Sequence, residues 1–268
     1  MKKIFLVAVL LLAVCFLMIT AGADEIILAD TDSVYVKITG MEQNADSFEM
    51  KLYLENKSGA NAMFTLNRVV VNGYVTDPFW ACEVSPGKKA NSVVDFYDLT
   101  DDGITGDVNA VEFVLRVYNN DDWMADDLFN ERIVVYPMGE ENAVVQERES
   151  VDSDIVITDS DNISIVVTGF GVDDLWGYTA SVYLVNRTDV TLIFAAEDVS
   201  VNGFMVDPFW ATEVPPHARE YSKIHWSFSS FEENNIENVD EIEMKFRVYD
   251  SDDWMADAIY DEVSIIKP

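Results

Sequence analysis

The chain has 268 residues, which at roughly 100–200 residues per domain corresponds to one large domain or two ordinary ones. Its 49 acidic and 17 basic residues give a net charge of −32, and a chain so acidic repels phosphate backbones, which excludes a general nucleic-acid binder. Two cysteines and two histidines are too few for a disulfide framework or a Cys/His zinc site. Apolar residues make up 49 %, enough for a substantial core.

The N-terminus has the pattern of a secretory signal peptide. Two lysines precede an apolar run over residues 4–19, and small residues at 21 and 23 form a cleavage site. We expect removal of residues 1–23 and a secreted or cell-surface protein that does not insert into the membrane after cleavage. An uncleaved anchor is the alternative, although this run is short of the roughly 20 residues that span a bilayer. Cleavage would leave 15 basic and 49 acidic residues.

The rest of the chain contains one module twice. The stretch VNGYVTDPFWA over residues 71–81 returns as VNGFMVDPFWA over 201–211, and RVYNNDDWMAD over 116–126 returns as RVYDSDDWMAD over 247–257. A nearly constant offset of 130 or 131 residues indicates a tandem duplication of a whole domain. We assign residues 24–137 to repeat 1, residues 138–155 to an acidic linker and residues 156–268 to repeat 2.

Both repeats are predicted to consist of strands. Apolar and polar residues alternate over 111–118 and 242–249, which is typical of half-buried antiparallel strands. Asn-Gly at 72–73 and at 202–203 predicts two hairpin turns in which both residues have positive φ. About seven or eight short strands in each repeat predict an all-β protein of two tandem immunoglobulin-like antiparallel β-sandwiches.

The two shared motifs also carry a family resemblance. The pairing of VNGxxxDPFW with a later RVYxxDDWMAD resembles immunoglobulin-like repeat modules of exported or membrane-attached proteins of Gram-positive gut bacteria. The resemblance covers nearly the whole chain after residue 23. It implies the sandwich fold and an extracellular location, and it implies no activity and no catalytic residue.

The repeated acidic segment is a candidate cation site. Clustered carboxylates repel one another unless a cation neutralises them, and Ca²⁺ takes several oxygen ligands. The competing interpretation is a turn whose Asp side chains bond to local backbone while Trp and Met pack inward. We favour the turn and expect no cofactor, because Trp123 and Trp254 interrupt each acidic run where a ligand would be needed. The candidate calcium ligands are Asp121, Asp122, Asp126, Asp252, Asp253 and Asp257.

Tryptophans are the candidate ligand-binding residues, since sugars stack on exposed indole rings. Trp80 and Trp210 end the shared DPFW motif, where they would either present aromatic platforms or plug each sandwich. The residue of repeat 1 that corresponds to Trp176 is Ser47, so the shared fold does not require a tryptophan at this position. Trp176 is therefore the better candidate for an exposed contact.

The sequence therefore predicts a non-catalytic extracellular binding or structural module. Its partner would be a protein or a glycan. A calcium-stabilised carbohydrate-binding module is the first alternative, and a hydrolase on a β-sandwich is the second. No Gly-x-Ser-x-Gly elbow and no phosphate-binding glycine loop is present in the sequence.

Overall fold

The computed structural model describes residues 26–253 and 255–268, so the predicted signal peptide lies outside the described residues. Repeat 1 contains β1 (Ile26–Asp30), β2 (Val34–Gln43), β3 (Phe48–Asn56), β4 (Ala62–Val71), β5 (Tyr74–Val75), β6 (Ala81–Val84), β7 (Lys89–Phe96), β8 (Val111–Asn119) and β9 (Phe129–Val135). Repeat 2 contains β10 (Ile155–Asp159), β11 (Ile163–Asp173), β12 (Gly177–Asn186), β13 (Leu192–Val201), β14 (Phe204–Met205), β15 (Ala211–Val214), β16 (Arg219–Trp226), β17 (Ile242–Asp250) and β18 (Tyr260–Ile266).

Among the described residues, helical structure is confined to two short pieces. A 3₁₀ turn, η1 (Glu140–Asn142), lies in the linker, and an α-helix, α1 (Phe228–Glu233), joins β16 to β17 in repeat 2. The sequence did not predict this helix. Within the described ranges, no helix has the length and apolar character needed to cross a membrane.

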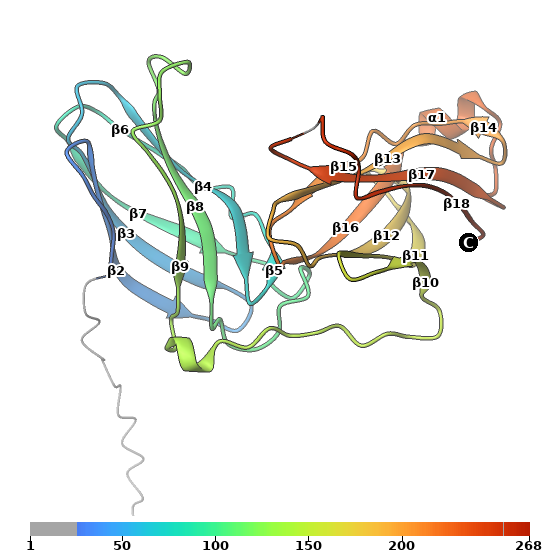
Figure 1. Ribbon diagram of the computed structural model, residues 1–268, viewed down its shortest axis with the longest axis horizontal. Helices are drawn as coiled ribbons and strands as arrows, with labels where there is room; N and C mark the ends of the chain where they lie inside the picture. The colour runs from blue at the N-terminus through green and yellow to red at the C-terminus, as the bar shows by residue number, and fades with distance from the viewer. Residues whose placement is uncertain (1–25, 254) are drawn as a thin grey trace, which may run out of the picture.

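Each repeat is a two-layered antiparallel sandwich. In repeat 1 the layer β1-β2-β3-β7 faces the layer β6-β4-β8-β9, and in repeat 2 the layer β10-β11-β12-β16 faces β15-β13-β17-β18. The chain crosses between layers after β3, β6 and β7, which is the Greek-key path of immunoglobulin-type sandwiches. Figure 1 shows the two sandwiches side by side, repeat 1 in blue to green and repeat 2 in yellow to red. The predicted all-β class with two tandem antiparallel sandwiches is confirmed.

The alternating pattern explains how each strand contributes to the core. Along β3, β8 and β17 every second residue is buried and packs between the layers. The Asn-Gly turns also form as predicted, with φ of 50° and 89° at Asn72 and Gly73, and 52° and 83° at Asn202 and Gly203. The Asn72 carboxamide additionally accepts hydrogen bonds from two backbone N–H groups ahead of β8, so this motif serves the fold.

The two sandwiches meet in an aromatic joint. Arg219 of β16 pairs with Tyr74 of β5 in a parallel bridge, and its N–H donates to the Gly73 carbonyl at 2.9 Å. The Tyr74 ring stacks on Tyr221 with centroids 5.9 Å apart, and Tyr221 contacts Tyr183 at 5.1 Å. Tyr74 is only 2 % exposed. A layer of repeat 1 therefore continues into a layer of repeat 2.

Apolar packing also crosses this joint. Val166 and Val185 of repeat 2 belong to the buried cluster of repeat 1, and Val70 of repeat 1 belongs to the cluster of repeat 2. Gly103 has φ of +83°, and a Cβ there would lie 2.3 Å from the Tyr221 ring, so only glycine allows this approach. The repeats thus bury apolar surface against each other as well as within themselves.

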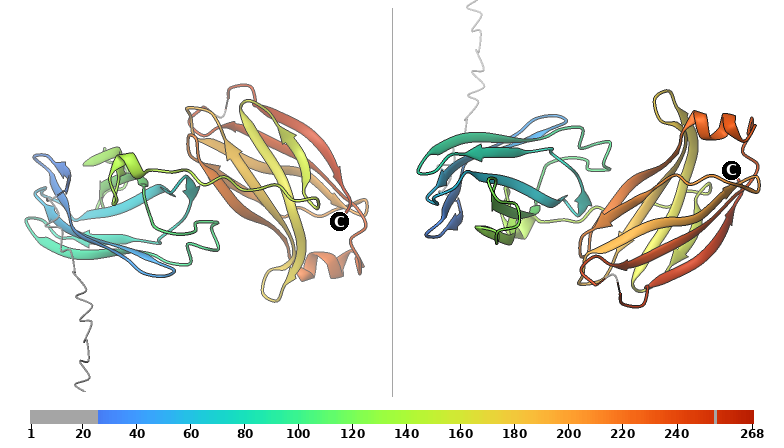
Figure 2. Two further views of the ribbon diagram at one scale, coloured as in Figure 1. Left: turned by 90° about the horizontal axis from the view of Figure 1, so that it is seen from below. Right: turned by 90° about the horizontal axis from the view of Figure 1, so that it is seen from above.

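The acidic linker follows the outside of the joint, as the two views of Figure 2 show. Most of its residues are exposed, but it is tied down near Arg148, whose guanidinium forms an ion pair with Asp154 at 2.5 Å and lies over the Tyr183 ring. The preceding residue, Glu147, forms an ion pair with Arg219 of β16 at 2.9 Å. The linker is therefore held against repeat 2 by charged and cation–π contacts.

The joint gives a matched pair of substitutions. Tyr74→Ala should lower the free energy of unfolding by about 3–5 kcal/mol, because it empties a buried aromatic site. Phe204, the corresponding residue of repeat 2, is 48 % exposed, so Phe204→Ala should cost about 1 kcal/mol or less. Urea unfolding followed by circular dichroism measures both. Equal losses of unfolding free energy in the two variants would contradict the burial of Tyr74 between the repeats.

Candidate functional site

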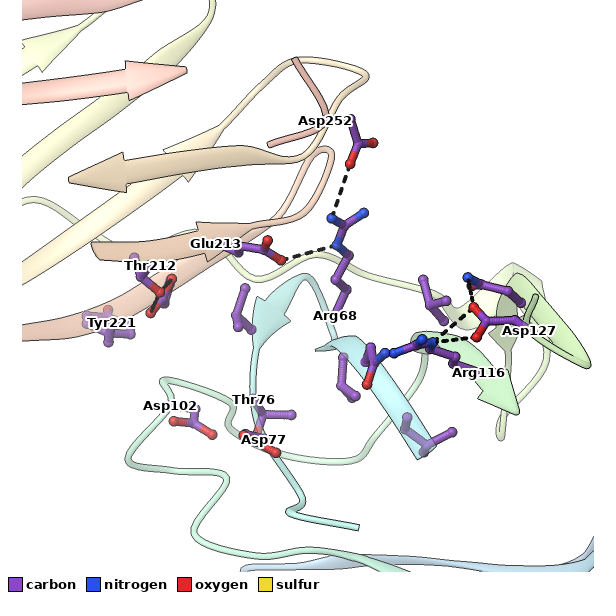
Figure 3. A pocket seen from close by; sticks show the side chains of 17 residues that line it. Arg68, Thr76, Asp77, Asp102, Arg116, Asp127, Thr212, Glu213, Tyr221 and Asp252 are labelled. Carbon is purple, nitrogen blue, oxygen red and sulfur yellow. Dashed lines mark hydrogen bonds and ion pairs between the residues drawn. The ribbon is translucent and has the colours of Figure 1, made fainter. Parts of the chain in front are cut away.

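A cleft of about 1050 Å³ lies between the repeats, beside the aromatic joint. Figure 3 shows its walls, one supplied by β4, β5 and the loop around Asp102, and the other by β15 and β16. Its charged lining residues are Arg68, Asp77, Asp102, Arg116, Asp127, Glu213, Glu220 and Asp252. Six carboxylates against two guanidinium groups make the cleft acidic.

Arg68 is engaged with the opposite repeat. It lies at a bulge in β4 with φ of 51°, and from there its Nε contacts Glu213 at 3.2 Å. Its Nη2 lies 3.2 Å from the Ser251 hydroxyl and 3.6 Å from the Asp252 carboxylate. These contacts tie the mouth of the cleft together across the two repeats.

Arg116 is engaged within its own repeat. Its Nε donates to both carboxylate oxygens of Asp127 at 3.0 Å. Its counterpart Arg247 contacts Glu197 of β13 at 3.4 Å instead of the acidic loop. Both cleft arginines are thus already paired with carboxylates.

Three cleft carboxylates have no ion-pair partner among the described residues. Asp77 accepts the N–H of Phe79 at 2.8 Å, and Glu220 accepts the Thr212 hydroxyl at 2.8 and 3.0 Å, while Asp102 lies in the wall opposite Glu220. Burial raises the pKa of Asp102 above its usual range. When ionised, these groups have no neighbouring cation among the described residues to offset their negative charge.

Glu220 is the most perturbed of the three. Burial raises its pKa to about 7 in spite of the hydrogen bond from Thr212, and the charge of Asp102 adds to the increase. Sequence reasoning missed this residue, although a signal existed. Glu220 lies on the same face of β16 as the buried Ile224 and Trp226, so an acid occupies a core-facing position.

The repeated acidic segments lie on the loops that follow β8 and β17, and the second of these loops reaches repeat 1 through Arg68. Asp121 accepts the backbone N–H of Asn61 at 3.0 Å and its carboxamide at 2.9 Å, and Asp122 accepts the N–H of Met124 at 3.2 Å. Asp252 alone reaches the cleft, through Arg68. The remaining candidate ligands, Asp126, Asp253 and Asp257, are exposed.

Two of the candidate calcium ligands, Asp121 and Asp122, therefore already accept local hydrogen bonds. Among residues 26–253 and 255–268, no group of three or more His, Cys, Asp or Glu side chains has the arrangement to hold a metal ion. The calcium hypothesis stays untested by this arrangement and remains a prediction to be measured.

The expected inward packing of Trp and Met in these loops is wrong. Trp123 and Met124 are each 78 % exposed, and Met255 is equally exposed. The physical reason is visible in Figure 1, where the loop between β8 and β9 extends beyond the layers and has no core beneath it. Trp254 lies outside the described residues.

The DPFW tryptophans lie at the sandwich surface with their polar edges bonded. Trp80 and Trp210 are half-buried, and their indole N–H groups donate to Ser92 at 2.9 Å and to Ser222 at 3.1 Å. The preceding phenylalanines project instead. Phe79 is 84 % exposed at a positive φ, as is Phe209 at 91 %. Their exposure was not predicted from the sequence, in which both belong to the shared DPFW motif.

Trp176 is 59 % exposed at the turn between β11 and β12. Its ring centroid lies 6.0 Å from that of His225 on β16. It is therefore the most exposed of the three tryptophans proposed as ligand-binding residues, and it lies far along β12 and β16 from the cleft at Glu220.

Comparison with known proteins adds little about function. No protein-family model matches the chain, and no curated protein matches it. The solved structures to which it is similar include a red sea bream transglutaminase and the YadV chaperone, each at 12 % identity and a TM-score of 0.23. The similarity covers 89 % of this chain and 31 % of the transglutaminase, and 81 % of this chain and 92 % of the chaperone.

The chain thus spans about a third of the length of the transglutaminase. At a TM-score of 0.23 neither similarity carries an argument about what the chain does. The resemblance to repeat modules of Gram-positive gut bacteria stays a prediction.

The raised pKa of Glu220 predicts a pH-dependent stability. The folded state keeps this proton up to about pH 7, whereas the unfolded chain loses it near 4.5, so the contribution of Glu220 to stability falls as pH rises between these values. Relative to the native chain, Glu220→Gln should therefore gain on the order of 3 kcal/mol between pH 4 and pH 8. Urea unfolding across this range tests the difference. A variant whose stability runs parallel to that of the native chain would contradict it.

The melting temperature in the presence of calcium tests whether the acidic loops bind a cation. Screening by salt should raise the melting temperature of so acidic a chain, and NaCl at matched ionic strength should reproduce the whole effect of millimolar CaCl₂. A calcium-specific increase that disappears in the variant with Asp121→Asn and Asp122→Asn would instead establish a cation site, because a ligand that binds only the folded state stabilises it by mass action.

Proposed function

We propose that this chain is a non-catalytic extracellular binding module whose inter-repeat cleft seats a positively charged segment of a protein partner. The extracellular part of the proposal is supported by the signal-peptide pattern over residues 1–23. The binding part is carried by one observation, the acidic cleft that neither sandwich forms alone.

The charges of the cleft favour a cationic ligand. Its two arginines already have carboxylate partners, whereas Asp77, Asp102 and Glu220 have no cationic partner among the described residues. Removing carboxylates from water without a counter-charge is unfavourable, as the raised pKa of Glu220 shows. A lysine or arginine side chain of the partner, placed between the two walls, would supply that positive charge and stabilise the ionised form of the cleft carboxylates.

The same carboxylates support a hydrolase less well. General acid–base catalysis by two carboxyl groups needs environments that push their pKa values apart, so that one group stays protonated and the other ionised. Burial raises the pKa of both Asp102 and Glu220. The Glu220 carboxylate is also occupied by the Thr212 hydroxyl. This pattern favours binding over catalysis.

A tetralysine peptide is a suitable first probe, with affinity measured by calorimetry. We expect binding that strengthens as pH rises from 6 to 8, because Glu220 ionises near pH 7. The variant with Asp102→Asn and Glu220→Gln should bind about tenfold more weakly or worse, a loss of about 1.4 kcal/mol.

The matched control removes the same charge from the linker. Glu140 and Glu141 are exposed in η1, so the variant with Glu140→Gln and Glu141→Gln should keep nearly the native affinity. If both double variants weaken binding equally, the peptide responds to the overall acidity of the surface, and the cleft is not the site.

A further inference from the structure

A second hollow lies on the outer face of repeat 2, on the layer formed by β11, β12 and β16. Its volume is about 280 Å³, close to the lower end of the roughly 300–1,000 Å³ that ligand pockets span. We call it the outer-face groove, and it is lined by Thr168, Gly169, Phe170, Gly171, Val172, Asp173, Thr179, Ser181 and Lys223. Hydroxyl groups and glycines dominate this lining, in contrast to the acidic cleft.

The matching face of repeat 1 is filled. There Glu42 of β2 and Lys51 of β3 form an ion pair of 2.9 Å across the two strands. By strand register the corresponding residues of repeat 2 are Gly171 and Ser181. Because repeat 1 forms the same sandwich with long charged side chains on this face, the groove is not a requirement of the fold.

Trp176 lies next to the groove and is not part of its lining: its ring contacts His225, which pairs in register with the lining residue Thr179. The Asp173 carboxylate accepts the backbone N–H of Trp176 at 2.9 Å, which holds the turn and keeps the exposed indole beside His225. Gly177 follows with φ of +92°, and a Cβ there would lie 2.2 Å from the Trp226 carbonyl, so glycine alone lets the turn approach β16. Repeat 1 has Ser47 in place of Trp176.

The histidine that Trp176 contacts has an unmet hydrogen-bonding group. Nδ1 of His225 is buried and has no hydrogen-bond partner. Burial lowers the pKa of His225, so the ring is mainly neutral at pH 7. Buried polar atoms without partners are uncommon in folded proteins, so the strand end beside the groove differs from an ordinary packed edge.

The groove is also electrically balanced. Asp173 is ionised, since the backbone N–H groups of Trp176 and Leu175 lower its pKa, and Lys223 supplies one positive charge along the same lining. One carboxylate and one ammonium leave no net charge, which is unusual in a chain of net charge −32. A neutral polar ligand suits this surface better than an ion.

We propose that the outer-face groove binds a neutral saccharide, with the Trp176 indole stacked on an apolar C–H face of the sugar ring. Hydroxyl groups of Thr179 and Ser181 would bond the sugar hydroxyls, with Lys223 and Asp173 as the charged donor and acceptor. This proposal deepens the proposed binding function by adding a glycan site, and it does not depend on the inter-repeat cleft.

The test is calorimetry of the full chain from residue 24 with five separate tetrasaccharides. Four are neutral, built from β-1,4-glucose, α-1,4-glucose, β-1,4-N-acetylglucosamine and β-1,4-mannose, and the fifth is tetragalacturonate. We expect at least one neutral probe to bind with a Kd of about 1 mM or tighter and tetragalacturonate to bind more weakly.

Two variants locate the binding. Gly171→Glu together with Ser181→Lys restores the ion pair of repeat 1 and fills the groove, so it should weaken binding at least tenfold without lowering the melting temperature. Trp176→Ala should weaken binding to a similar degree. Trp123→Ala removes an even more exposed indole from repeat 1 and serves as the matched control, with no expected change.

Three results would overturn the proposal: no neutral probe bound at about 10 mM, binding that survives both groove variants, or tetragalacturonate as the preferred ligand. Should the double variant unfold, Trp176→Ala decides alone, because its side chain is exposed. The variant with Asp102→Asn and Glu220→Gln should leave saccharide binding unchanged, so failure of the groove and failure of the cleft give different results.

Discussion

The buried ring of Tyr74 is the contact on which the arrangement of the two sandwiches depends. The ring stacks on Tyr221, while the Tyr74 backbone pairs with β16 and continues one layer of repeat 1 into repeat 2, and apolar residues of each repeat enter the core of the other. Both walls of the cleft extend from this joint, with Arg68 closing the far side through Glu213. Without the joint the cleft would have no fixed width, and its carboxylates would return to water.

Comparing the two repeats distinguishes residues that the shared fold requires from residues that belong to a site in one repeat. Asn56 and Asn186 are fully buried in equivalent places, and each donates to two or more backbone carbonyls, so their repetition follows from packing. The differences between the repeats are more informative about ligands. Glu220 replaces Ala90 at the cleft, and Gly171 replaces Glu42 at the outer-face groove. Each exchange changes the chemistry of a surface while the strand beneath it stays in register.

The two sites also differ in electrostatic character. The cleft concentrates carboxylates in a partly desolvated space, where charge is costly and a cation is favoured. The outer-face groove combines one carboxylate, one ammonium and several hydroxyls. The proposed basic segment and the proposed saccharide would therefore not compete for the same groups.

The sequence alone determined the class, the duplication and the two Asn-Gly turns, because strand alternation and positive-φ turns depend on residues close together in the chain. It could not place Tyr74 in a joint while leaving Phe204 at the surface, since burial at that position depends on which surface meets it from the other repeat. The same holds for the cleft and for the raised pKa of Glu220. These properties arise from groups more than a hundred residues apart, whose proximity and desolvation only the tertiary structure decides.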